Sequence, residues 1–139
     1  MKPEEVEYMR WRLQRAQETL SEACLMMGSG LLYGAVNRVY YACFHALSVL
    51  LYTENDYPSK HSGAISLFDR KWIKTGRLPV DMSKFYHMLF DNRQKSDYGD
   101  RVVFQQQEVG LWITEAELFV GRISAVVEQA ILESEQDDT

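Results

Sequence analysis

Several features that would place this 139-residue chain in a familiar class are missing from it. Its longest apolar runs are far shorter than the roughly 20 residues that cross a bilayer, so we expect no membrane-spanning segment. The first residues, Met-Lys-Pro-Glu-Glu-Val-Glu, lack the basic and then apolar pattern of a secretory signal. The two cysteines, Cys24 and Cys43, form no CxxC pair, and we interpret both as small buried residues in a reducing cytoplasm.

The motifs of several enzyme classes are missing as well. The three histidines do not stand at metal-ligand spacing and there is no HExxH sequence, so we expect no metal site. Gly28-Ser29-Gly30 follows a predicted helix rather than a strand and lacks the GxxxxGKS or GxxxxGKT pattern of a phosphate loop. No GxSxG nucleophile elbow is present. We therefore predict no cofactor.

The charge is in modest acidic excess, with 15 Lys and Arg against 20 Asp and Glu and a net charge of −5. That balance argues against nucleic-acid binding through bulk electrostatics. The charges are unevenly distributed, because residues 60–77 contain five basic residues and one acid, whereas the end of the chain is acidic. The basic stretch either contacts phosphates or is the solvated face of a helix.

Helical periodicity accounts for nearly the whole chain. A composition of 46% hydrophobic and 25% charged residues is typical of a soluble globular protein, and we find no useful strand-like alternation, repeat or low-complexity tract. We predict helices at about 4–27, 31–52, 62–74, 82–97 and 105–133. The prediction is a single all-α domain over residues 1–139, a five-helix up-and-down bundle with a core at about 4–133 and a fraying acidic tail at 134–139.

Residues 34–52 form the helix around which the rest is organised. On a helical wheel they divide into an apolar arc and a polar sector roughly 100° wide. A helix with so wide an apolar arc is packed on most sides, so we expect it at the centre of the bundle. The polar sector, called the polar seam below, consists of Gly34, Asn37, Arg38, Tyr41, His45, Ser48 and Tyr52. The seam faces a cleft or a partner, or its groups satisfy one another.

Arg38 and His45 are the catalytic candidates on this seam. They are seven residues apart, so they point the same way about 10.5 Å apart along the helix axis, with Tyr41 between them. A guanidinium can hold a phosphate through two hydrogen bonds, and an imidazole can exchange a proton near neutral pH. The pair could cleave an RNA backbone without metal, with His45 taking the 2′-hydroxyl proton and Arg38 stabilising the phosphate oxygens. Alternatively, the seam residues bond to one another or to a partner chain and hold the bundle in register.

Two further polar stretches could join this seam. Arg93 and Asp97 are four residues apart and form either a second polar rim facing the seam or an ordinary salt bridge at a helix end. Lys60 and His61 precede the third helix and form either part of a phosphate site or a simple loop and cap. The remaining interpretation is a small-ligand pocket lined by Tyr41, His45 and Tyr98.

Three blocks of the sequence also carry a family resemblance over about residues 5–130. The blocks are Asn37-Arg38-Val-Tyr-Tyr41-Ala-Cys-Phe-His45-Ala, Lys60-His61-Ser-Gly63 followed by Phe68, and Arg93-Gln-Lys-Ser-Asp97-Tyr98. With these blocks the chain resembles a prokaryotic HEPN-domain protein. The resemblance implies a five-helix bundle, usually a homodimer, often encoded beside a small nucleotidyltransferase as a toxin–antitoxin pair. Many such proteins are metal-independent ribonucleases with an Arg-x(4–6)-His motif at a dimer cleft.

Arg38 and His45, with six residues between them, match that motif. The toxin form that its partner adenylylates has Arg, four residues, His, one residue and Tyr, and here Tyr98 stands in the histidine position after Arg93. We therefore predict a cytoplasmic RNA- or nucleotide-binding HEPN domain that acts as a ribonuclease toxin beside a nucleotidyltransferase. The alternative is a non-catalytic module that dimerises and binds a nucleotidyltransferase. The binding residues expected around the catalytic pair are Asn37, Tyr41, Lys60, His61, Arg93, Asp97 and Tyr98.

Overall fold

The computed structural model describes residues 1–97 and 101–137 and is helical almost throughout. Its elements are α1 (Pro3–Gly28), α2 (Leu32–Tyr52), α3 (His61–Phe68), η1 (Asp69–Ile73), α4 (Val80–Asp97) and α5 (Gln106–Asp137). The short η1 is a π-helical turn that continues α3, so the two together correspond to the predicted third helix. The described ranges contain all five predicted helices and no strand, which confirms the all-α bundle.

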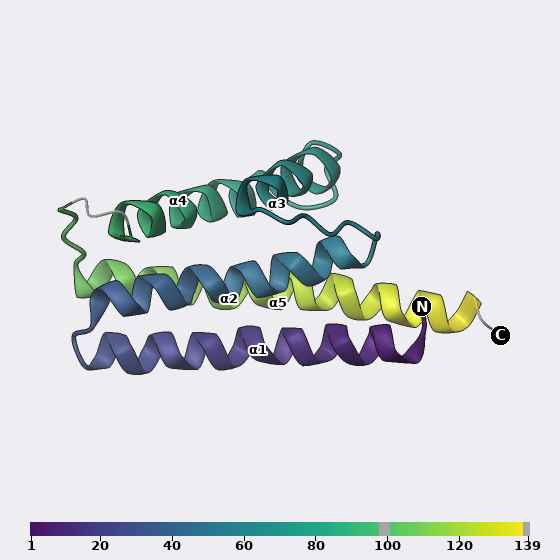
Figure 1. The fold of residues 1–139 in the computed structure, drawn as a ribbon, viewed down its shortest axis with the longest axis horizontal. Coiled ribbons are helices and arrows are strands. Elements are labelled where there is room, and N and C mark those ends of the chain that lie inside the picture. The colour runs from purple at the N-terminus through teal and green to yellow at the C-terminus, as the bar shows by residue number, and fades with distance from the viewer. Residues whose placement is uncertain (98–100, 138–139) are drawn as a thin grey trace.

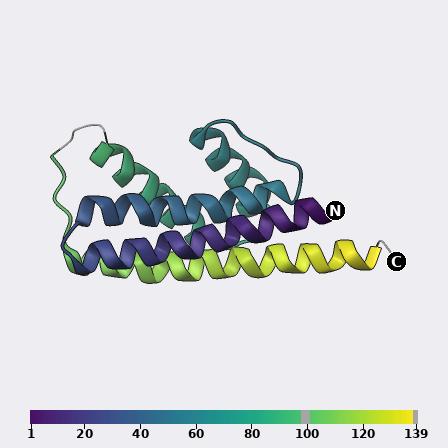
Figure 2. The ribbon, with the colours of Figure 1, turned by 60° about the horizontal axis from the view of Figure 1, so that its bottom comes forward.

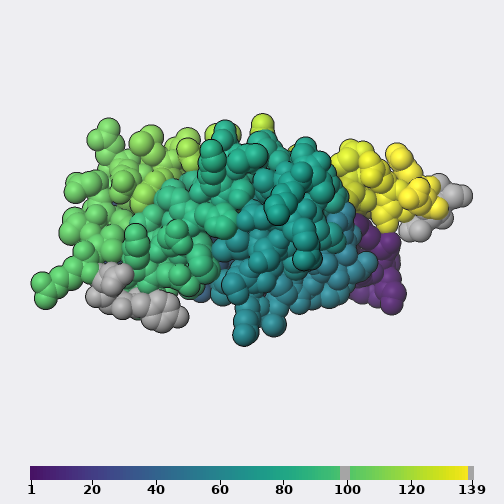
Figure 3. Space-filling model, turned by 90° about the horizontal axis from the view of Figure 1, so that it is seen from above, coloured from purple at the N-terminus to yellow at the C-terminus, as the bar shows by residue number. Residues whose placement is uncertain are grey.

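Three long helices, α1, α2 and α5, lie side by side, and α3, η1 and α4 cover one side of them (Figures 1 and 2). Seen from that side, the α3–α4 layer covers the middle of the molecule and the end of α5 projects beyond it (Figure 3). The connection between α1 and α2 is short and contains Gly30 at φ +78°, a left-handed conformation that glycine adopts without strain. This turn makes α1 and α2 antiparallel.

The helix α2 is the centre of the bundle, because it packs against α1, α3, α4 and α5. Eleven of its residues are buried, and these are the predicted apolar arc with one exception, the partly exposed Phe44. Every residue of the polar seam is partly exposed. The predicted division of this helix into a wide apolar arc and a polar seam is therefore confirmed, and the seam is the side that is partly exposed.

The predictions for Cys24 and for the end of the chain are wrong. Cys43 is buried as expected, but Cys24 is exposed, because it lies one residue beyond the buried Ala23 and is turned away from the core. The helix α5 does not fray at residue 134 but continues through Asp137. Ser134 Oγ accepts a 2.8 Å hydrogen bond from the amino group of Met1, which holds this end of α5 against the start of the chain.

None of the helices within residues 1–97 and 101–137 combines the length and the apolar character that crossing a membrane requires.

Candidate functional site

The polar seam of α2 is bordered by α1 on one side and by α3 and α4 on the other. From α1, Arg12 Nε donates a 3.2 Å hydrogen bond to His45 Nδ1. From α4, Arg93 Nη1 donates a 3.2 Å hydrogen bond to the Tyr41 hydroxyl. At the start of α3, the ring of His61 lies 4.4 Å from that of Phe44, centroid to centroid. Four helices thus contribute side chains to the seam and its borders.

Arg38 is held on the seam by neutral partners. Its Nε and Nη2 atoms donate hydrogen bonds of 3.2 and 2.7 Å to Asn37 Oδ1. Its guanidinium carbon lies 5.4 Å from the centroid of the Tyr41 ring, which is cation–π distance. Among the residues that the structure describes, no carboxylate forms an ion pair with Arg38. A partly exposed guanidinium without an acidic partner can bind an anion.

His45 is tied to α1 through Arg12. Because its Nδ1 accepts the bond from Arg12, the proton of the neutral ring is on Nε2. Nε2 reaches solvent and has no partner within the described ranges. Arg12 Nη1 donates a 3.0 Å bond to the Tyr8 hydroxyl, and in the described chain Arg12, like Arg38, forms no ion pair with a carboxylate.

Partial burial, together with the positive charges of Arg12, Arg15 and Arg38, lowers the pKa of His45 to about 4. His45 is therefore neutral at physiological pH. Arg38 and His45 make no direct bond, but the charge of Arg38 acts on the imidazole, so the predicted pair lies within electrostatic range.

This lowered pKa has a consequence for stability. The folded protein binds a proton at His45 less readily than the unfolded chain, whose histidine has the ordinary pKa of 6.5. The stability that the neutral His45 contributes to the folded protein is complete above pH 6.5 and is lost as the pH falls from 6.5 toward 4. Because the imidazole is partly exposed, we expect the free energy of unfolding to fall by only about 1–2 kcal/mol over that range. Urea unfolding at stepped pH should show a smaller loss for His45→Gln than for the native protein, and equal losses would contradict the assignment.

Arg93 approaches the seam from α4 and is almost enclosed, with a side chain that is 11% exposed. Its guanidinium carbon lies 4.7 Å from the centroid of the Tyr40 ring and 5.6 Å from that of Tyr41. Asp97 forms the predicted i,i+4 ion pair with it at 3.3 Å. Arg93 Nε is buried and has no hydrogen-bond partner among the described residues. Arg93 thus forms an ion pair at the end of α4 and also places a cation beside the seam.

A chain of hydroxyl groups leads from the core to His61. Tyr86 donates a 3.3 Å hydrogen bond to the Tyr40 hydroxyl, which lies 2.6 Å from His61 Nδ1. Burial raises the pKa of both phenols, so they stay protonated. The Tyr40 hydroxyl therefore donates the hydrogen bond to Nδ1, which leaves Nε2 of His61 as an N–H donor. Burial and the charge of Arg93 lower the pKa of His61, so a second neutral imidazole lies beside the seam.

The structure places the remaining predicted residues less centrally. Lys60 is exposed at the N-cap of α3, where its side chain makes no capping bond. Tyr98 lies outside the described residues. Sequence reasoning missed Arg12 and Tyr8, which face the seam from α1. The only signal for them was a polar pair at i,i+4 beside the buried stripe of that helix.

Fold and site together define a small helical bundle whose central helix carries a seam lined by arginine, histidine and tyrosine. The sequence model of the HEPN domain matches residues 9–126. The chain therefore belongs to the HEPN-domain family, as its three sequence blocks predicted.

The chain is similar to proteins of Thermotoga maritima and Methanocaldococcus jannaschii. It is 41% identical to a UPF0332 protein of Thermotoga maritima, over 88% of this chain and 91% of that protein. It is 31% identical to a Methanocaldococcus jannaschii protein named "Putative toxin MJ0605", over 86% of this chain and 88% of that one. It is 27% identical to "Putative toxin MJ0142" of the same organism, over 91% and 87%.

Proposed function

We propose that this protein is a metal-independent ribonuclease toxin that binds RNA along the polar seam, with Arg38 and His45 as its catalytic pair. The observation that carries the proposal is that Arg12 and Arg38, which have no acidic partners in the described chain, flank a neutral imidazole. The neutral imidazoles of His45 and His61 both lie near arginines, on a protein whose net charge is negative. The names of two relatives as toxins support the same function.

A phosphate bound at the seam would change the state of His45. An anion beside Arg12 and Arg38 offsets the charges that lower the pKa of His45, so the pKa rises toward its ordinary value. Arg12 can turn to the phosphate and release Nδ1, which then takes the 2′-hydroxyl proton. The 2′-oxygen bonds to phosphorus as the bond to the 5′-oxygen breaks, and water protonates the leaving oxygen. Arg38 stabilises the charge on the phosphate oxygens.

Aromatic side chains beside these cations favour single-stranded RNA as the substrate. Tyr41 lies on the seam and Phe44 beside it, both partly exposed, and Tyr8 continues this surface onto α1. Trp11 is exposed with its ring centroid 6.2 Å from that of Tyr8. Bases of a single strand can stack on such rings while arginines contact the phosphates, whereas the bases of a duplex are not accessible for stacking.

The proposal extends to the cellular arrangement that the family resemblance implies. The protein acts in the cytoplasm as a homodimer, and a nucleotidyltransferase serves as its antitoxin partner. In this arrangement Lys60, His61, Arg93 and Asp97 bind RNA, a nucleotide or that partner.

A non-catalytic module that dimerises and binds a nucleotidyltransferase is the second candidate. The observation in its favour is that Arg12 occupies Nδ1 of His45, whose pKa of about 4 makes it a weak base in the free protein. In this case the seam residues hold a partner chain in place of RNA.

The salt dependence of RNA binding tests the proposal. Arg38→Gln is expected to weaken the binding of a single-stranded RNA about tenfold, through loss of a charged hydrogen bond. It should also reduce the slope of log Kd against log salt by about 0.7, the value for one released counterion on a single strand. Arg70→Gln removes an exposed arginine from η1 in the basic stretch and serves as the matched control. Binding and cleavage are measured in EDTA.

The two candidates give opposite results. The ribonuclease is supported if the native protein cleaves RNA in EDTA and if Arg38→Gln loses RNA affinity while Arg70→Gln does not. The interaction module is supported if the native protein neither binds nor cleaves RNA. In that case Arg38→Gln should have a lower solution mass or lose its binding to a nucleotidyltransferase. Loss of affinity in Arg70→Gln alone would place RNA on the basic stretch instead.

A further inference from the structure

The outward face of α5 carries a row of exposed leucines spaced seven residues apart. Leu111, Leu118 and Leu132 are 64%, 68% and 49% exposed, and the exposed Ala125 fills the remaining position in the row. A spacing of seven drifts only about 20° per step around a helix, so these residues share one side. By the helical period this side is opposite the buried face of α5. Single exposed leucines are ordinary, but a row along one helix is typical of an interface.

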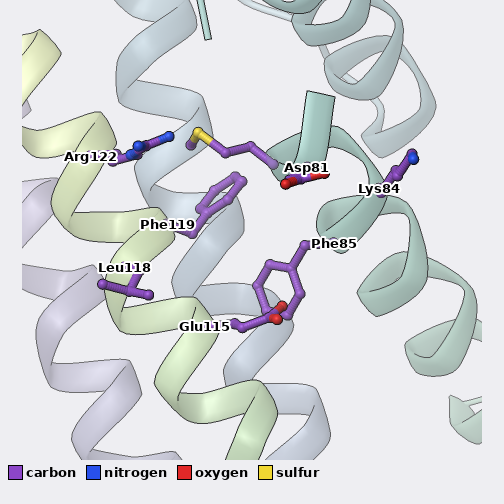
Figure 4. Close-up of a pocket in the computed structure, with 8 residues that line it drawn as sticks. Asp81, Lys84, Phe85, Glu115, Leu118, Phe119 and Arg122 are labelled. Carbon is purple, nitrogen blue, oxygen red and sulfur yellow. The ribbon is translucent and has the colours of Figure 1, made fainter. Parts of the chain in front are cut away.

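A groove runs beside this row, between α5 and α4. It has a volume of about 500 Å³, and its apolar lining includes Leu118 together with Phe85 and Phe119, whose ring centroids are 6.2 Å apart. Figure 4 shows Phe85 of α4 and Phe119 of α5 in this groove, with Glu115 and Arg122 on the α5 side. Both rings are themselves buried, so the groove supplies a hollow beside the row, and the exposed apolar area is that of the leucines.

The charges on this face favour one orientation of an identical partner. Glu115 and Arg122 lie on either side of Leu118, and in the part of the chain that the structure describes neither forms an ion pair. Two parallel α5 helices would place like charges opposite each other. Two antiparallel helices that cross at Leu118 place each Glu115 opposite Arg122 of the other copy. The same register places Leu111 opposite the small Ala125.

We propose that this face of α5 binds a second copy of the chain, with the two α5 helices antiparallel and crossing at Leu118. The contact is isologous, so each ion pair between Glu115 and Arg122 occurs twice. Because α2 packs against the inner side of α5, the contact leaves the polar seam of both copies uncovered. It is thus an interface separate from any that forms at the seam, and the ribonuclease proposal does not depend on it.

A charge-exchange series tests the orientation. Arg122→Glu and Glu115→Arg should each weaken self-association about tenfold or more, because each creates two like-charge contacts. The double variant restores opposite charges and should return to within about threefold of the native association constant. Glu117→Arg makes the same charge change on α5 away from this face and should have no effect. Sedimentation equilibrium gives the constants, and a double variant that stays dissociated would overturn the proposal.

Disulfide trapping tests the crossing point. In a Cys24→Ser background, Leu118→Cys places two thiols next to each other across the two-fold axis and should form a covalent dimer under mild oxidation. Leu132→Cys lies on the same row but far from the axis in the antiparallel register, so it should not form a covalent dimer. Equal trapping at both positions would indicate parallel helices, and no trapping at position 118 would exclude this contact. Far-UV circular dichroism and RNA cleavage, both expected to be unchanged, show that the fold and the seam are intact.

Discussion

Replacing His45 by glutamine is expected to lower the rate of metal-independent RNA cleavage by at least about 100-fold, the usual contribution of a general base. Glutamine retains an acceptor for the 3.2 Å bond from Arg12 but cannot exchange a proton near neutral pH. The helical fold and RNA affinity should therefore change little while turnover is lost. Single-turnover rates with excess protein in EDTA separate the chemical step from binding.

The pH dependence of the same reaction gives a second measure of His45. The profile of kcat/KM reports the free protein and should fall below a pKa of about 4, whereas kcat reports the complex and should fall at a higher pH. Arg12→Gln removes a charge that lowers the pKa of His45, so kcat/KM of this variant should begin to fall at a higher pH than that of the native protein. His87→Gln is the control, since His87 is exposed and bonds to Asp69 outside the seam. Undiminished cleavage by His45→Gln across this pH range would end the catalytic proposal.

The central helix could be predicted from sequence because its two sectors differ so strongly. Only a helix surrounded by others buries an apolar arc as wide as that of α2, and the seam residues could be identified as the part left facing solvent. The exception, Phe44, is informative. It was assigned to the buried arc by its chemistry, yet it is partly exposed and contacts His61, because the start of α3 lies beside the seam rather than over it.

The buried face of α5 follows a repeat of three and four residues only in part, because Val109, Ala116, Phe119 and Ile123 are buried but Trp112, on the same repeat, is partly exposed. Near the end of the helix this repeat falls on Val126 and Ala130, whereas the structure buries Val127 and Ile131. That repeat averages 3.5 residues per turn and drifts about 20° per seven residues from a straight helix with 3.6. Over the length of α5 the drift reaches about one residue, so the buried face moves forward by one position.

The contacts around the seam could not be read from the sequence. Arg12 and His45 are 33 residues apart, and which residue of α1 lies opposite which residue of α2 depends on how the helices pack. Tyr40 and Tyr86 were ordinary core positions by periodicity, and their hydrogen bond appears only when α4 is placed against α2. Sequence pattern locates a polar seam, but the partners that set its pKa values come from tertiary structure.

Two substitutions of Arg93 are expected to differ in their effect on stability but not in their effect on RNA binding. Its guanidinium packs against the rings of Tyr40, Tyr41 and Phe90, so Arg93→Ala removes these contacts and leaves space beside them. We expect that variant to lose about 2–4 kcal/mol of unfolding free energy. Arg93→Met keeps an unbranched, polarisable side chain against the rings and should retain most of the native stability. Urea unfolding of the three proteins measures the difference.

The reason to expect so little loss from Arg93→Met is that arginine is a costly residue at this position. Its side chain is 11% exposed, its Nε is buried without a partner among the described residues, and its ion pair with Asp97 lies at the helix end. Replacing a buried cation by an apolar residue of similar length is often neutral or stabilising. A buried polar group that lowers stability is expected where function requires its charge, so both variants should weaken RNA binding about tenfold. If Arg93→Met binds RNA as well as the native protein does, Arg93 contributes to packing alone and the binding surface ends at α2.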